Sequence, residues 1–172
     1  MRIETNLFKI RHAAIKREDE NYRFRSFLKG KDPEWVDRIV HRLHEELTKK
    51  IDCRTCSNCC RAFAPLLSDE DIGVLAGMEN ITPEEYEEKY CEADMFGDAC
   101  LNSKPCRYLG ENQCSIPMDK RPEQCRDFPY TGKKGFTSRL LSIISFYGVC
   151  PIVYNLMEQL KKEVEFRGKR AT

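Results

Sequence analysis

Cysteines are the residues of this 172-residue chain that are best suited to chemistry, and four of its ten cysteines lie close together. The stretch 53–60 reads Cys-Arg-Thr-Cys-Ser-Asn-Cys-Cys and supplies Cys53, Cys56, Cys59 and Cys60. Two cysteines separated by two residues can hold one metal ion from a single tight turn, and this spacing recurs in zinc and iron–sulfur sites. A third cysteine at the same spacing means that one tetrahedral or cubane site needs one further sulfur.

The adjacent pair Cys59 and Cys60 indicates more than one simple site. Because neighbouring side chains diverge, we expect the two sulfurs not to reach the same ion without strain. The pair therefore favours either two sites or one polynuclear cluster with sulfurs on different irons. Further sulfurs are available downstream, at Cys91, Cys100, Cys106, Cys114, Cys125 and Cys150.

Metal binding competes with a disulfide framework, because the cysteine count is even. The first residues, Met-Arg-Ile-Glu-Thr-Asn, contain no apolar signal stretch, and no apolar run approaches the length of a spanning helix. We therefore expect a cytoplasmic protein without a membrane contact. Thiols stay reduced in the cytosol, so dense cysteine usage there indicates a metal rather than disulfides.

The all-sulfur ligand set excludes magnesium, calcium and manganese and leaves zinc, an iron–sulfur cluster or Cu(I). Cysteines at this spacing with a remote Cys150-Pro151 are similar to the ferredoxin arrangement, although the same residues would serve a zinc ribbon. The adjacent pair at 59–60 shifts the prediction towards an iron–sulfur cluster over Zn(II).

Charge balance supports a thiolate centre. Four thiolates around Zn(II) or an oxidised four-iron cluster leave a charge of about −2 to be balanced. Arginine directly follows four cysteines, and a fifth lies near: the set is Arg54, Arg61, Arg107, Arg126 and Arg121. Cys150 precedes a predicted helix, where the helix dipole lowers a thiol pKa. His41 and His44 are alternative ligands, but a tetrahedral site closes at four, and thiols already suffice.

The remaining pattern predicts a mainly α fold with irregular cysteine-rich loops and at most a small β-hairpin. Asp32-Pro33 and Thr82-Pro83 are helix starts, each with a capping residue followed by proline. Together with apolar periodicity they predict helices over 7–29, 33–50, 69–75, 83–93, 138–147 and 151–164, and a helical turn at 122–129. Residues 106–116 predict a hairpin that brings Cys106 and Cys114 together.

The cysteine motifs resemble those of the YkgJ-type cysteine-cluster family, whose members carry a CxxCxxCC zinc- or iron-chelating domain. The matching pieces are Cys53-x2-Cys56-x2-Cys59-Cys60, Pro105-Cys106-Arg107-Tyr108-Leu109, Cys114-Ser115-Ile116, Arg121-Pro122-x2-Cys125-Arg126-x-Phe128-Pro129 and Cys150-Pro151. The resemblance implies that eight cysteines hold the metal: Cys53, Cys56, Cys59, Cys60, Cys106, Cys114, Cys125 and Cys150. Cys91 and Cys100 are then extras. The chain departs from the family at Ser57 or Asn58, where glycine is frequent, and at Pro117, where tyrosine is frequent.

The predicted organisation is one compact unit with three segments: an N-terminal helical segment (1–50), the cysteine-cluster domain (51–160) and a basic tail (161–172). Residues 69–98 carry eleven acidic residues against Lys89 alone, while the first 31 residues carry nine basic residues against four acidic ones. The net charge of +1 gives no electrostatic footprint for nucleic acid.

We therefore predict a metal-binding protein whose centre is structural or serves as a carrier or sensor. One alternative is an iron–sulfur electron-transfer protein or oxidoreductase. Another is a zinc-stapled adaptor whose acidic 69–98 face binds a basic protein partner. No catalytic constellation is visible in the sequence. The domain also resembles part of flagellin lysine methylases, but the chain contains no glycine-rich nucleotide loop that would support that activity.

Overall fold

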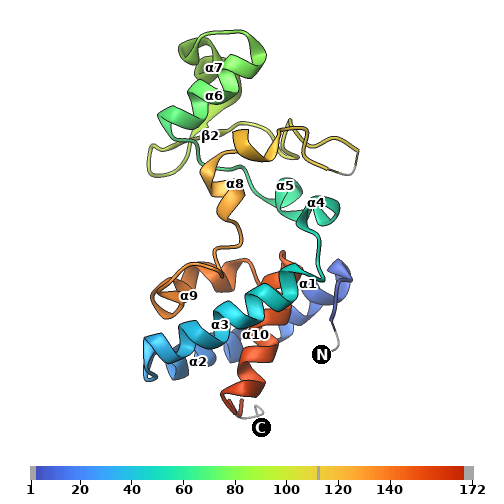
Figure 1. Cartoon of the computed structure of the whole chain (residues 1–172), viewed down its shortest axis with the longest axis vertical. Helices are drawn as coiled ribbons and strands as arrows, with labels where there is room; N and C mark the ends of the chain where they lie inside the picture. Colours follow the sequence, from blue (N-terminus) through green and yellow to red (C-terminus); the bar gives the residue numbers. More distant parts are fainter. Residues whose placement is uncertain (1–2, 112, 169–172) are drawn as a thin grey trace. The chain divides into compact units, whose positions relative to one another are not determined.

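The computed structural model describes residues 3–111 and 113–168, and of Arg54 the backbone only. The end of the predicted basic tail, residues 169–172, therefore lies outside the described residues, as does Asn112 in the predicted 106–116 hairpin. The prediction of a mainly α fold with a small hairpin is confirmed (Figure 1). No helix among the described residues is long and apolar enough to cross a membrane.

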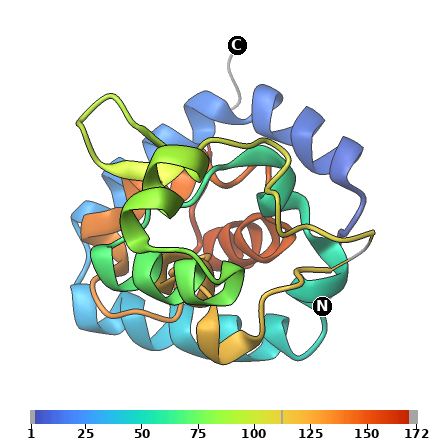
Figure 2. The same ribbon diagram turned by 90° about the horizontal axis from the view of Figure 1, so that it is seen from above.

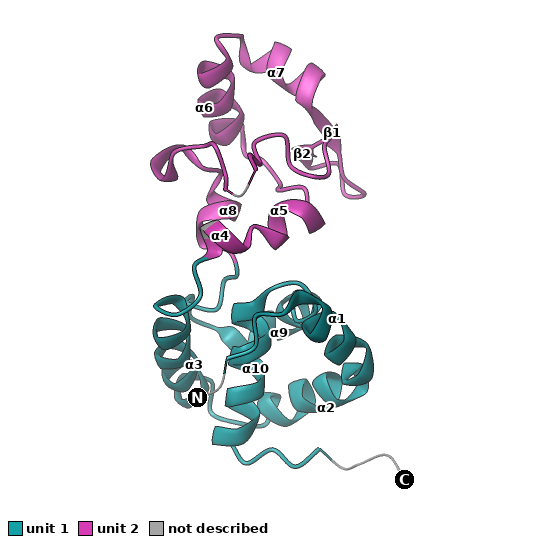
Figure 3. Cartoon of the chain, turned by 90° about the vertical axis from the view of Figure 1, so that its right-hand side faces the viewer, with its two compact units in different colours: residues 1–52, 129–172 teal, residues 53–128 magenta. Residues whose placement is uncertain are grey.

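The chain divides into two compact units (Figure 3). Unit 1 contains residues 1–52 and 129–172, and unit 2 contains residues 53–128. Unit 1 is therefore assembled from both ends of the sequence, with unit 2 inserted between them. This boundary divides the predicted 51–160 segment, because residues 129–160 pack with the N-terminal helices.

Unit 1 is a group of five helices: α1 (Leu7–Lys16), α2 (Glu18–Lys29), α3 (Pro33–Thr48), α9 (Phe136–Ser145) and α10 (Pro151–Glu163). Helix α10 lies between α3 and α1, as Figures 2 and 3 both show, and α9 packs on α2 and α3. The apolar faces of these helices form a dry core that includes Phe24, Val40, Leu43, Leu140 and Leu156. Burial of these faces is what stabilises the unit.

Two aspartates position the helices of unit 1. Asp32 begins α3 by accepting a hydrogen bond from the Glu34 backbone N–H at 3.0 Å, as the sequence predicts. Asp37, on α3, accepts from the backbone N–H groups of Gly135 and Phe136 at 2.6 and 2.9 Å and so caps the start of α9. The hydrogen bonds of Asp37 thus join α3 to the start of α9, two segments about a hundred residues apart in the chain.

The single helix predicted over 7–29 is wrong: the chain breaks at Arg17 and forms α1 and α2 separately. The Arg17 side chain contacts Glu158 of α10. Lys161, which the sequence assigned both to the 151–164 helix and to the basic tail, lies in α10 and is buried, with its ammonium donating to Glu20 at 2.6 Å and to Glu158 at 2.8 Å. A charged cluster thus holds the α1–α2 junction against α10.

Unit 2 consists of shorter elements. In chain order they are α4 (Cys53–Cys56), α5 (Asn58–Ala62), α6 (Asp69–Glu79), α7 (Pro83–Tyr90), β1 (Cys91–Ala93), β2 (Ala99–Leu101), η1 (Met118–Lys120) and α8 (Glu123–Asp127). Strands β1 and β2 pair antiparallel, with Glu92 opposite Cys100. The small core of this unit contains Leu67, Ile72, Leu75, Ala76, Tyr86, Leu101, Tyr108 and Ile116.

Helices α6 and α7 both begin with capping boxes, at Ser68 and Thr82, as predicted. Two other expectations fail. Helix α6 continues through Gly77 to Glu79 and ends where Asn80 takes a left-handed conformation. The helix expected to reach residue 93 ends at Tyr90, because the chain becomes the β1–β2 hairpin. In the described part of the 106–116 segment, Leu109 and Cys114 form an isolated antiparallel bridge.

Candidate metal centre

The structure divides the predicted ligands between the two units. Seven of them lie in unit 2: Cys53, Cys56, Cys59, Cys60, Cys106, Cys114 and Cys125. The eighth, Cys150, lies in unit 1, where it is buried and forms the N-cap of α10 ahead of Pro151. Its predicted place in the same centre stays a prediction.

The segment 53–60 consists of two short helices joined at Ser57. This residue has φ +47° and ψ +15°, a left-handed conformation that a residue with a Cβ adopts at a cost. Its side chain is buried, and the Arg61 guanidinium donates to its carbonyl oxygen at 3.3 Å. Glycine is frequent here in the family that the motifs resemble, and the left-handed backbone is the physical reason why glycine suits the position.

The two adjacent thiols converge, contrary to our expectation. The Cys59 and Cys60 sulfur atoms are 4.0 Å apart. Sulfur ligands of a tetrahedral zinc ion lie about 2.3 Å from the metal, which places them roughly 3.8 Å from one another. The helical turn of α5 thus directs both sulfurs to one place, and the pair no longer argues for a polynuclear cluster over a single ion.

The Cys60 thiol is more acidic than an ordinary cysteine thiol. Its contact with Cys59, opposed by burial and assisted by the charges of Arg121 and Arg61, lowers its pKa to about 6. A thiol with this pKa is largely a thiolate near neutral pH, and thiolate is the form that binds metal.

Three later cysteines gather near Cys60. The Cys106 backbone N–H donates to the Cys60 carbonyl at 2.8 Å, and the turn that follows brings Cys114 opposite Leu109. Cys125 retains exposed surface, yet protein atoms crowd its sulfur. This loss of water, together with charge repulsion from Cys106, Cys60 and Cys114, raises the pKa of Cys125 to about 12. The four sulfurs are therefore close enough for their charges to interact.

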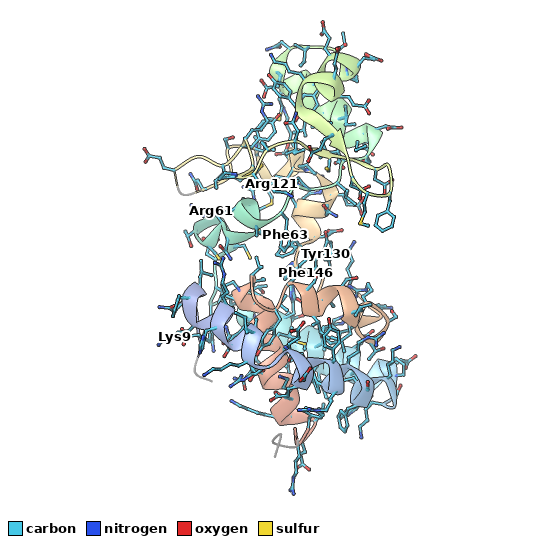
Figure 4. All side chains as sticks on the ribbon, turned by 180° about the vertical axis from the view of Figure 1, so that it is seen from behind. Lys9, Arg61, Phe63, Arg121, Tyr130 and Phe146 are labelled. Carbon is cyan, nitrogen blue, oxygen red and sulfur yellow. The ribbon has the colours of Figure 1, made fainter. Side chains whose placement is uncertain are left out.

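Of the predicted charge-balancing arginines, Arg61 and Arg121 act on this group. Both favour the thiolate of Cys60, and Figure 4 shows them on unit 2. The Arg121 side chain is held by a hydrogen bond to the Ile116 carbonyl at 3.0 Å. Arg126 donates to the Asp119 carbonyl, and the side chain of Arg54 lies outside the described residues.

Arg107 has a positioning role that the sequence did not reveal. Its guanidinium lies 3.5 Å from the centre of the Tyr90 ring and donates to Glu79 at 2.9 Å and to the Tyr108 hydroxyl at 3.0 Å. The Tyr108 and Tyr86 hydroxyls are 2.8 Å apart in the buried core. This network joins the residue after Cys106 to α6 and α7.

The remaining candidate ligands lie elsewhere. His41 and His44 lie on α3 in unit 1, and His44 contacts the Thr131 hydroxyl at 2.8 Å. Cys91 and Cys100 lie on β1 and β2, where burial raises the pKa of both thiols. They are not among the thiols that repel Cys125.

The ligand chemistry of the thiols of Cys60, Cys106, Cys114 and Cys125 fits a soft or borderline metal ion. Within residues 3–111 and 113–168, no three His, Cys, Asp or Glu side chains are arranged so that they could hold an ion. The proximity of these four thiols, their soft sulfur atoms and two neighbouring guanidinium groups suit zinc or iron.

One family model matches the chain. It is named CxxCxxCC, is described as "Putative zinc- or iron-chelating domain", and covers residues 52–147, more than half of the sequence. No curated protein and no solved structure matches the chain. The matched range contains the seven predicted ligands of unit 2 and ends before Cys150. It supports metal binding, and it gives zinc and iron equal support.

Proposed function

The chain belongs to the CxxCxxCC family, and on that premise we propose that it holds zinc or iron through cysteine thiolates for use as a carrier, a sensor or a structural centre. The observation that carries this proposal is the proximity of Cys60, Cys106, Cys114 and Cys125 in unit 2. These cysteines come from three separate segments, so their approach is a result of the fold and not of sequence spacing.

We assign Cys59 and Cys60 the first role in binding, because their sulfurs already lie 4.0 Å apart and the pKa of Cys60 is lowered. Cys106, Cys114 and Cys125 then complete the centre, and Arg61 and Arg121 offset its negative charge. Cys53 and Cys56, on the preceding short helix α4, are proposed as further ligands of a second ion or a cluster. Cys150 is proposed as the eighth ligand.

The partial exposure of the cysteines favours a carrier or sensor. Cys53 is exposed, and Cys56, Cys59 and Cys60 are half-buried, so small molecules and partner thiols can reach them. The metal would supply a Lewis-acidic or redox-active centre, while this chain's residues bind it, orient the sulfurs and balance their charge.

The decisive experiment is to purify the protein without oxygen and measure iron, zinc and sulfide together with its visible spectrum. Broad visible absorption with iron and sulfide identifies a cluster, and bleaching by dithionite supports the electron-transfer alternative. A colourless protein with zinc and no sulfide identifies a zinc centre. A protein without bound metal, even after anaerobic reconstitution with either metal, contradicts the proposal.

Matched variants locate the centre. We expect Cys60→Ser to lose most of the bound metal, because it removes a thiol whose pKa is lowered and whose sulfur lies 4.0 Å from that of Cys59. Cys91→Ser, a half-buried cysteine of the same unit outside the group, should keep the wild-type metal content. Equal metal content in both variants would contradict the ligand assignment.

A further inference from the structure

The turn between β1 and β2 is rigidly built. Its five residues, 94–98, are called the hairpin tip below. The Asp94 carboxylate accepts hydrogen bonds from the backbone N–H groups of Phe96 at 2.8 Å and Asp98 at 3.0 Å. Asp94 also pairs with Asp98 and Gly97 through backbone hydrogen bonds, and Gly97 has φ +90°, a conformation that favours glycine. The tip therefore has one defined conformation.

This ordered tip presents two large apolar side chains to solvent. Met95 is 88% exposed and Phe96 is 81% exposed, so neither contributes to the core of unit 2. Rigid, exposed aromatic and methionine side chains are characteristic of protein interfaces, because little conformational entropy is lost when they are buried there.

The surroundings of the tip restrict its partner. Residues 69–98 carry eleven acidic side chains against Lys89 alone. Glu92 lies in β1 just before the tip, Asp94 and Asp98 belong to it, and Glu84, Glu85, Glu87 and Glu88 are exposed on the preceding helix α7. This charge repels nucleic acid and anionic membranes and attracts a basic surface. The tip thus requires a partner that is both apolar and basic.

The outer face of α1 in unit 1 has these properties. It consists of Phe8, Arg11, His12 and Ile15, which recur every three or four residues and therefore share one side of the helix. Phe8 is 79% exposed and Ile15 is 74% exposed, while Ile10 on the opposite side is fully buried. The Phe8 and His12 rings stack at 6.4 Å.

Positive charge surrounds this face. The first 31 residues carry nine basic side chains against four acidic ones, and Lys9, labelled on α1 in Figure 4, is exposed beside the apolar side chains. The apolar spacing along α1 matches the way amphipathic helices meet a partner.

We propose that the hairpin tip of one copy of this protein docks on the outer face of α1 of a second copy. Met95 and Phe96 would pack against Phe8 and Ile15, and the flanking acids would pair with Lys9, Arg11 and their neighbours. Each copy carries one tip and one α1 face, so two copies can form the contact at least once. A net charge of +1 adds little overall repulsion to oppose association.

Sedimentation velocity of the full-length protein, purified with its metal, tests this inference. We expect a dimer whose population rises with concentration and falls as salt is added, because part of the attraction is electrostatic. The double variant Met95→Ser and Phe96→Ser should shift the equilibrium at least tenfold towards the monomer. Met118→Ser and Leu141→Ser are matched controls, since both residues are exposed apolar side chains elsewhere, and they should leave it unchanged.

A charge exchange tests the pairing of the two surfaces. Asp98→Lys alone and Arg11→Glu alone should each weaken the dimer, and mixing the two single-variant proteins should restore association between them. Monomers at every concentration at low salt would overturn the inference. A dimer that the double serine variant leaves intact would also overturn it. The metal content of each variant is measured as well, so that a loss of association can be distinguished from a loss of the proposed metal binding.

Discussion

Helices in unit 1 run for ten to sixteen residues and bury side chains such as Phe24, Leu43 and Leu156, whereas the described helices of unit 2 run for three to eleven. The core of unit 2 surrounds Tyr86 and Tyr108 and does not extend to α4 or α5, which carry four of the cysteines. Unit 1 is therefore stabilised by apolar packing, while the cysteine-bearing half of unit 2 has little apolar packing of its own. A bound metal would supply the missing stability there.

The largest expected effect is that of metal removal. Stripping the metal with a chelator should abolish hydrogen-exchange protection in segment 53–62, which lies outside the apolar core of unit 2, because metal-binding energy there acts as folding energy. Protection in α3 and α10 should be unchanged. Exchange measured by peptide-resolved mass spectrometry checks this. If both units lost protection together, the proposed difference between them would be wrong.

A complementary substitution weakens the apolar core of unit 1 and leaves the proposed metal centre of unit 2 untouched. Leu43→Ala removes a fully buried side chain and should lower the free energy of unfolding of unit 1 by about 2–5 kcal/mol. Trp35 lies in α3 and is the single tryptophan of the chain, so its fluorescence during denaturant unfolding reports on unit 1. Metal content should not change. Leu141→Ala, at a half-exposed position in α9, is the control and should cost less than about 0.5 kcal/mol.

Lowering the pH should destabilise unit 1, because the Glu158 carboxylate becomes protonated. Burial works to raise the pKa of this carboxyl, but Lys161, Tyr147 and Arg17 together hold it below its usual range. A group with a lowered pKa in the folded state stabilises the protein above its unfolded pKa, and this contribution disappears as pH falls through the folded pKa. Glu158→Gln should therefore cost roughly 2 kcal/mol at neutral pH and progressively less below about pH 4. Unfolding monitored through Trp35 across pH measures this, and a pH-independent cost would contradict it.

The smallest expected effect is a gain in stability and metal affinity in unit 2. Ser57→Gly should stabilise the 53–60 segment by about 1 kcal/mol, because glycine adopts the left-handed backbone of this position without the strain of a Cβ. Metal affinity should rise by up to about fivefold, and competition with a chromophoric chelator measures it. Asn58→Gly, at the helical position that follows, is the control and should not improve affinity. A loss of affinity in Ser57→Gly would show that the buried serine side chain matters more than the backbone.

Local chemistry explains which elements could be predicted from the sequence. Asp32-Pro33 and Thr82-Pro83 specify helix starts through contacts within three residues, and the predicted caps are confirmed. The β1–β2 hairpin was missed because the acidic helical pattern before it was extended too far. The Asp94 and Gly97 pair was its local indication, since aspartate followed by glycine three residues later is typical of a tight turn.

The candidate centre was predictable only in its ligand types. The proximity of Cys60 to Cys106 depends on a hydrogen bond between segments 46 residues apart, and Arg107 takes its place through Tyr90 and Glu79. The spacing of the cysteines in the sequence does not indicate such contacts between distant segments. The convergence of Cys59 and Cys60 is local, but it follows from the short helix α5, which the sequence did not predict.

The insertion of unit 2 into unit 1 has a consequence for synthesis on the ribosome. Helix α3 cannot bury its apolar face until α10, its main packing partner, has been translated. All nine cysteines of unit 2 leave the ribosome before α10 does, since the chain emerges from its N-terminus. Unit 2 therefore has the opportunity to fold and acquire its metal while unit 1 is still unfinished. Completion of α10 is the last step of assembly.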